Sequence, residues 1–193
     1  MSALPATHPA AVDTPAERPL LARLSVSMFG MVMGVGGLSN AWALSHTVFG
    51  LPLAVSQVLL AVAVAVYAVL LVVHAAKLAR HPEAVAEEFH HPVRASFFPA
   101  VSVASVVLSI GLRRYAPLAS EGLWLAGASL HLVLALVLVR RWVLHAQDES
   151  VMTPAWFIPI VGNILVPVGG VPLGYVQASW FFFSIGQIGR AHV

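Results

Sequence analysis

The sequence predicts an all-α integral membrane protein built from helical hairpins. Of its 193 residues, 59% are hydrophobic and only 9% are charged, whereas a soluble domain usually has about a quarter of its residues charged. Five apolar stretches approach or reach the length of about 20 residues that a helix needs to cross a bilayer. Short and long links alternate between these stretches, and short links join antiparallel neighbours. Composition, run length and link length therefore agree on this fold class.

The five complete spans are expected at residues 24–46, 51–76, 95–112, 118–139 and 155–174. A sixth begins at Tyr175 with YVQASWFFFSIG, and about 12 residues are too few to cross a bilayer as a helix. We therefore expect a truncated sixth span. Residues 24–187 would then be the N-terminal part of a longer transmembrane domain.

Both ends of the chain are expected to lie outside this domain. Residues 1–23 contain four prolines and show no helical periodicity, which predicts a disordered cytoplasmic tail. They do not resemble a signal peptide, because the apolar run that follows exceeds the ~7–15 residues of a signal core. The final IGRAHV, residues 188–193, matches the translation of a widely used sequencing adapter, ATC-GGA-AGA-GCA-CAC-GTC. We expect it to be a non-native tail; a short protein with a polar end is the alternative.

The Lys and Arg residues predict the orientation. Seven of them fall in the N-terminal tail and the two long links, on one side of the membrane, and only Arg113 and Arg114 fall on the other. Positive residues favour the cytoplasmic side, so the N-terminus is expected to be cytoplasmic in a multi-pass protein of the cell membrane. The net charge of +2 and its scatter argue against a nucleic-acid partner. The absence of cysteine excludes disulfides and thiolate metal sites.

Odd and even spans differ in kind. The first contains MFGMVMGVGGLSNAW, the third has a proline and a Ser/Ala stripe, and the fifth, TPAWFIPIVGNILVPVGG, has three prolines, three glycines and an asparagine. The even spans are uninterrupted aliphatic runs such as QVLLAVAVAVYAVLLVV. Helix breaks are tolerated in a membrane only where protein or a water-filled cavity satisfies the backbone. We expect odd spans around a central pore and even spans facing lipid; ordinary helix packing is the alternative.

Two sets of residues are candidates for an anion path. The candidates for the pore lining are Phe29, Gly30, Gly34, Pro99, Ser102, Pro159, Gly162, Asn163 and Pro167, and those for the cytoplasmic mouth are His90, His91 and Arg94. Hydroxyls, an amide and the positive ends of broken helices can stabilise an anion without fixed charge. Asn163 has an alternative role as an interhelical hydrogen-bonding residue. Arg94 has an alternative role as an anchor to lipid phosphate.

These motifs resemble a known family. FGMVMGVGGLSNAW, EFHHPVRASFFPA, TPAWFIPIVGNILVPVGG and SWFFFSIG look like the tellurite-resistance/dicarboxylate transporter family, which includes the plant slow-type anion channels. The resemblance implies ten helices in five hairpins, inner helices around a central pore, and trimers. It also implies transport of small anions: chloride or nitrate in the plant channels, dicarboxylates or sulfite in fungal transporters, and tellurite resistance in bacteria. The family's pore-occluding phenylalanine lies in a ninth helix beyond this sequence.

The sequence favours passive conduction over coupled transport or catalysis. Away from the span ends, the ionisable residues within the spans are Glu121 and His131, whereas a proton- or sodium-coupled carrier usually keeps a buried acid. A coupled exporter of C4-dicarboxylate, sulfite or tellurite on the same fold is the alternative. A haem-binding redox protein is a remote one, because His74 and His131 are expected roughly 15 Å apart along the membrane normal. We expect no enzyme activity, cofactor or metal.

Overall fold

The computed structural model describes residues 19–144 and 153–191, and every regular element in these residues is helical. The α-helices are α1 (Leu20–Arg23), α2 (Phe29–Phe49), α3 (Leu53–Arg80), α4 (Pro82–His90), α5 (Pro99–Leu112), α6 (Pro117–Leu144), α7 (Ile158–Val161), α8 (Val166–Gly170) and α9 (Val176–Ala191). Short 3₁₀ turns are η1 (Val26–Met28), η2 (Arg94–Phe97), η4 (Pro154–Phe157), η5 (Gly162–Ile164) and η6 (Val171–Leu173). The predicted all-α class is confirmed.

Four segments of the described chain are long and apolar enough to cross a membrane: Leu53–Arg80, Arg94–Leu112, Pro117–Leu144 and Pro154–Leu173. They correspond to the second to fifth expected spans. The first expected span forms α2, which has 21 residues and would be about 30 Å long. It is less apolar than the other four because glycine, serine, asparagine and histidine interrupt its hydrophobic residues.

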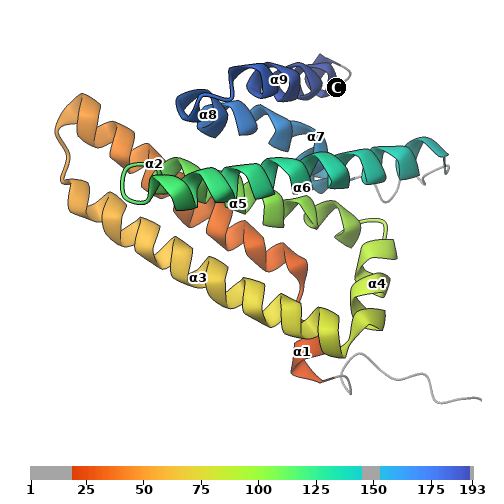
Figure 1. The fold of residues 1–193 in the computed structure, drawn as a ribbon. Coiled ribbons are helices and arrows are strands. Elements are labelled where there is room, and N and C mark those ends of the chain that lie inside the picture. The colour runs from red at the N-terminus through yellow and green to blue at the C-terminus, as the bar shows by residue number, and fades with distance from the viewer. Residues whose placement is uncertain (1–18, 145–152, 192–193) are drawn as a thin grey trace, which may run out of the picture.

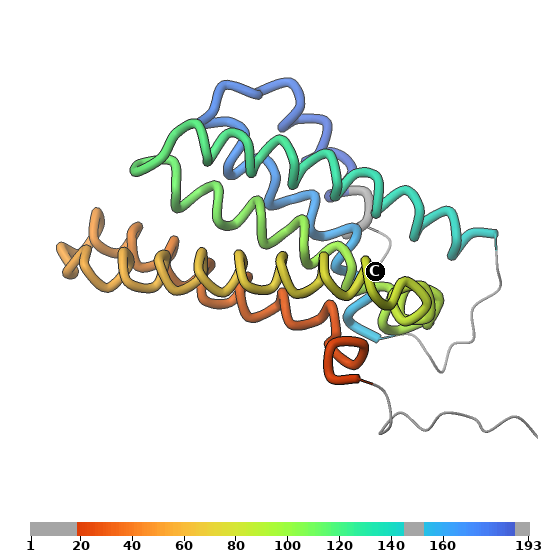
Figure 2. The backbone as a smooth tube through the Cα atoms, turned by 60° about the horizontal axis from the view of Figure 1, so that its bottom comes forward, coloured from red at the N-terminus to blue at the C-terminus, as the bar shows by residue number. Residues whose placement is uncertain are grey.

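The helices pair in hairpins, as Figures 1 and 2 show. Gly50 ends α2 in the left-handed conformation, with φ of 72°, and its N–H bonds to the His46 carbonyl at 3.0 Å. This cap reverses the chain into α3, which begins directly after Pro52. A second tight turn joins α5 to α6, and proline at position 117 starts the new helix. Both turns lie at the same end of the bundle, and α1 and α4 lie at the other end (Figure 2).

Helix α5 is the central element of the described chain. It packs against α2 on one side, against its hairpin partner α6 on another, and against α7 and α8 of the broken fifth span. Accordingly, 67% of the most apolar stretch of the third span, Arg94–Leu112, is buried, compared with 22% for α3 and 33% for α6. The third span is therefore internal and the second and fourth are peripheral. Aliphatic side chains such as Val72 and Leu136, 70% and 62% exposed, cover the peripheral helices.

The fifth span is a chain of short helical pieces. Four of its five pieces start with a proline in the first turn, at positions 154, 159, 167 and 172, and the exception is η5. The run ends at Gly174 with φ of 91°. Proline has no N–H to donate and clashes with the preceding turn. The α-helical hydrogen bonds are therefore interrupted repeatedly. The predicted break in this span is present.

Three segments differ from the expected boundaries. Leu20–Arg23, placed in the disordered tail, forms the helical turn α1, while residues 1–18 lie outside the described chain. The first long link, expected to be a loop, contains helix α4, because proline at its first turn precedes an Ala/Glu-rich sequence of good helix formers. Helix α9 has 16 residues and includes residues 188–191 of the expected non-native tail; residues 192 and 193 are outside the description.

Candidate functional site

A buried polar cluster joins α5, α6 and the broken fifth span. The Ser102 hydroxyl donates to the Pro99 carbonyl at 2.7 Å, and its oxygen lies 2.9 Å from Nδ1 of His131. Since the single hydroxyl hydrogen goes to Pro99, the N–H at Nδ1 donates to Ser102. Both side chains are completely buried. The cluster thus fixes the imidazole ring against α5.

Gly162 lets the broken span approach this ring. A Cβ atom at position 162 would lie 2.4 Å from Cε1 and 2.7 Å from Nε2 of His131, and 2.9 Å from a methyl group of Val103. Real Cβ atoms essentially never come this close. Glycine is therefore required at this crossing for its small size, at a position where φ is ordinary.

Asn163 compensates for the break in the fifth span. Its Nδ2 group donates to the carbonyls of Pro159 and Ile160 at 3.0 Å each. Further along, the Val166 carbonyl accepts a hydrogen bond from Nε1 of Trp124 at 2.8 Å. Side chains thus bond to backbone carbonyls at several points along the interrupted segment. Both bonds donated by Asn163 stay within its own segment.

The nine predicted pore residues occupy different environments. Five of them, Pro99, Ser102, Pro159, Gly162 and Asn163, gather around His131 and are buried. Phe29 is also buried, but elsewhere: its ring packs edge-on against Tyr67, with centroids 5.8 Å apart, and 5.1 Å from the ring of His74.

The other three pore candidates are at least partly accessible. Gly30 and Gly34 are exposed on α2, and a Cβ atom at either would meet nothing within 4 Å. Pro167 is half-buried and lines a small apolar cavity with Trp180 and Phe183 of α9. Among these candidates in the described chain, the open positions are therefore on α2 rather than around His131.

The predicted mouth residues lie together where α4 meets η2. His91 caps the turn, because its Nδ1 accepts the N–H groups of Val93 and Arg94 at 3.2 and 3.3 Å. The Arg94 guanidinium lies 3.7 Å from the Glu87 carboxylate, and both side chains are about half exposed. His90 is exposed and bonds to the Ala86 carbonyl at 2.7 Å. The positive charge of Arg94 is thus shared with a neighbouring acid.

A buried ion pair near these residues was not predicted. The Lys77 ammonium lies 2.6 Å from the Glu88 carboxylate, and the two side chains are 3% and 4% exposed. Lys77 also donates to the Leu24 carbonyl at 2.6 Å, while Glu88 accepts from the Val26 N–H at 2.8 Å and the Ser25 hydroxyl at 3.0 Å. The pair ties the start of the first span to α3 and α4.

Several opposed effects act on the Glu88 carboxyl. Burial raises its pKa, but the hydrogen bonds from Lys77, Val26 and Ser25 and the charge of Lys77 together hold that pKa below its ordinary value. The group is therefore ionised in the folded protein. From the sequence, Lys77 is one of several basic residues at span ends and Glu88 is part of a polar link. The pair therefore becomes visible only in the fold.

The described residues contain no group of three or more histidine, aspartate, glutamate or cysteine side chains placed to hold a metal ion. The architecture and chemistry are those of a polytopic membrane protein of helical hairpins, with a buried central helix and an interrupted inner span. Discontinuous membrane helices of this kind form the substrate sites of many transporters.

The chain belongs to the voltage-dependent anion channel family, whose model matches residues 23–189. It is 29% identical over 167 residues to the tellurite resistance protein TehA homolog of Haemophilus influenzae, covering 86% of this chain and 51% of that protein. It is 26% and 30% identical over 177 residues to the S-type anion channels SLAH3 and SLAH2 of Arabidopsis thaliana, covering 28% and 34% of them. The chain thus spans about half the length of the first relative and less of the plant channels. The predicted family resemblance is confirmed.

Proposed function

We propose that this chain forms the N-terminal part of a membrane protein that conducts small anions passively through a pore bordered by its odd-numbered spans. The observation that carries the proposal is the membership of residues 23–189 in the voltage-dependent anion channel family. The internal position of the third span supports the predicted arrangement of inner and outer helices. Further inner helices would be needed to complete the pore.

The face of α2 that carries Gly30 and Gly34 is the best candidate for the pore lining in the described chain. Gly30 and Gly34 lie one helical turn apart on this face, and nothing fills the space where their side chains would be. The five buried candidates around His131 would act behind the pore wall, where they hold the fifth span in its broken form. Asn163 and Gly162 are the residues that maintain this form.

The buried charges favour a channel over a coupled carrier. A carrier that binds a proton or sodium ion usually keeps an intramembrane acid for it. Among the described residues, the buried carboxylate is that of Glu88, and it is neutralised by Lys77 at 2.6 Å. Glu121 is half-buried and accepts a hydrogen bond from the Tyr175 hydroxyl at 2.5 Å. Neither acid is left as an unpaired site for a coupling ion.

We further propose that the complete protein is a trimer in the cell membrane with a cytoplasmic N-terminus. Among the described residues, six Lys and Arg residues near the end of the bundle with α1 and α4, against Arg113 and Arg114 at the other end, support this orientation. The exposed aliphatic surfaces of α3 and α6 suit contact with lipid or with a second copy. Cysteine labelling from either side of sealed vesicles, at single sites introduced at positions 83 and 118, tests the orientation.

Current recording in planar bilayers tests the function, with the full-length gene product. Uncoupled chloride or nitrate currents that reverse at the anion equilibrium potential support the channel. Dicarboxylate or sulfite flux that requires a proton or sodium gradient would instead identify a coupled exporter. Gly34→Phe should block the pore and reduce conductance at least tenfold. Val72→Phe, on the exposed face of α3, is the matched control and should conduct like the wild type.

A further inference from the structure

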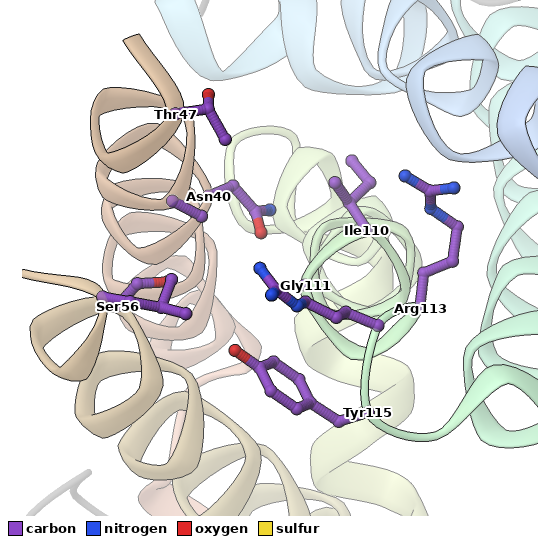
Figure 3. A pocket seen from close by; sticks show the side chains of 10 residues that line it. Asn40, Thr47, Ser56, Ile110, Gly111, Arg113 and Tyr115 are labelled. Atoms are coloured by element: carbon purple, nitrogen blue, oxygen red, sulfur yellow. The ribbon is translucent and has the colours of Figure 1, made fainter. Parts of the chain in front are cut away.

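A cavity of about 410 Å³ with polar groups in its lining opens between the ends of α2, α3 and α5 (Figure 3). These helix ends lie at the end of the bundle opposite α4 (Figure 1). Its polar lining comes from two helices, α2 and α3, and the turn after α5. These residues are Asn40, Thr47, Ser56, Arg113, Arg114 and Tyr115. None of the pore or mouth candidates lies in this lining.

The charge of the cavity is entirely positive. Arg113 and Arg114 are exposed at its rim, and the lining contains no aspartate or glutamate. Within the part of the chain that the structure describes, neither guanidinium forms an ion pair or a side-chain hydrogen bond. Two unpaired arginines beside a concave surface create a local positive potential that attracts anions.

The inner part of the cavity presents hydrogen-bond donors. Nδ2 of Asn40 uses one hydrogen on the Val107 carbonyl at 2.9 Å, which leaves its second hydrogen available. Within the described residues, the Tyr115 hydroxyl makes no hydrogen bond, and Figure 3 shows it pointing into the space between α3 and α5. The buried Ser56 hydroxyl forms the floor and is held by the Ser39 carbonyl at 3.0 Å.

Gly111 allows α5 to pack closely against Asn40 at the side of the cavity. A Cβ atom at position 111 would lie 2.9 Å from Oδ1 of Asn40 and 2.7 Å from a methyl carbon of Leu60. A larger residue there would displace the Asn40 amide from its position. Glycine thus brings the end of α5 close to this amide, directly before the two arginines.

We propose that this cavity is a binding site for an oxyanion group. Planar guanidinium groups match the geometry of oxyanions and bind them through paired hydrogen bonds, and the Asn40 amide and Tyr115 hydroxyl supply further donors. The ligand is a free oxyanion such as nitrate or sulfite, or the phosphate of an anionic lipid, since both present the same chemistry. Its role in loading or releasing transported anions rests on the proposed function, but binding does not.

Binding is tested on the 193-residue chain in phosphatidylcholine nanodiscs. Titration with sodium nitrate and sodium sulfite at constant ionic strength is followed by the thermal unfolding midpoint. A ligand that binds only the folded state raises this midpoint. We expect Arg113→Gln with Arg114→Gln to weaken the apparent affinity at least fivefold. The matched control is Arg80→Gln with Arg140→Gln, two exposed arginines elsewhere, which should titrate like the wild type.

A second titration, with an anionic lipid, distinguishes a free oxyanion from a lipid phosphate as the ligand. If a phosphatidylglycerol headgroup occupies the site, adding this lipid raises the midpoint of the wild type but not of the Arg113/Arg114 variant, and nitrate has no further effect. The inference is overturned if nitrate, sulfite and phosphatidylglycerol each act equally on the wild type and on that variant. A full-length protein that binds nitrate but carries no anion current would refute the proposed function and leave this site standing.

Discussion

Removing one half of the Lys77–Glu88 pair should destabilise the protein far more than removing both. Glu88→Gln keeps the shape of the side chain but removes its charge, so the Lys77 ammonium would retain only the neutral Leu24 carbonyl and the amide as partners. Leaving one charge of a buried pair uncompensated costs about 3–5 kcal/mol. We expect a loss of this size in the free energy of unfolding.

The double variant Lys77→Met with Glu88→Gln removes both charges together. Replacing a buried ion pair by neutral groups of similar volume is often close to neutral, so the double variant should recover most of the loss. Unfolding in mixed SDS and phospholipid micelles, followed by tryptophan fluorescence, gives the free energies. The matched control is Glu83→Gln, whose carboxylate is 72% exposed and lies 3.5 Å from His81; an exposed pair is worth about 0–1 kcal/mol.

The same pair predicts a dependence of stability on pH. Because the pKa of Glu88 is lower in the folded protein than its ordinary value of 4.5, its contribution is fully present above that value and is lost as pH falls through the folded pKa. Glu88→Gln should flatten this acid limb. The reasoning is refuted if Glu88→Gln costs less than about 1 kcal/mol, or if the double variant loses the sum of the two single losses.

Three further tests concern the broken fifth span. Gly162→Ala forces a Cβ atom against the buried ring of His131 and should lower the free energy of unfolding by about 1–3 kcal/mol. Gly34→Ala, in open space, is the control and should be neutral or slightly stabilising. Equal melting temperatures for the two variants would contradict the close approach of Gly162 to His131. Trp124→Phe removes the indole N–H that donates to the Val166 carbonyl, and it should lower the free energy of unfolding by about 1–3 kcal/mol in the same assay. An unfolding free energy equal to that of the wild type would count against this hydrogen bond. Pro159→Ala with Pro167→Ala should restore two backbone N–H donors to the helix. We expect this double variant to alter anion conductance or selectivity more than the yield of trimer in detergent. Normal assembly with wild-type currents would indicate that these prolines serve only helix packing.

The sequence by itself determined the class of protein and the position of most spans. Apolar runs of about 20 residues have one stable solution in lipid, because every backbone polar group must be satisfied within the segment. The prolines at 154, 159 and 167 likewise determined that the fifth span is interrupted. These properties are local, so composition and spacing suffice to predict them.

The tertiary structure decided which groups meet. Glycines on α2 and in the fifth span look alike in sequence, yet Gly34 faces open space and Gly162 touches His131. Lys77 and Glu88 are 11 residues apart on different helices, and burial turns two ordinary surface residues into an ion pair. Such pairings depend on how helices cross, and a side chain's neighbours across a crossing are set by packing that no single helix encodes.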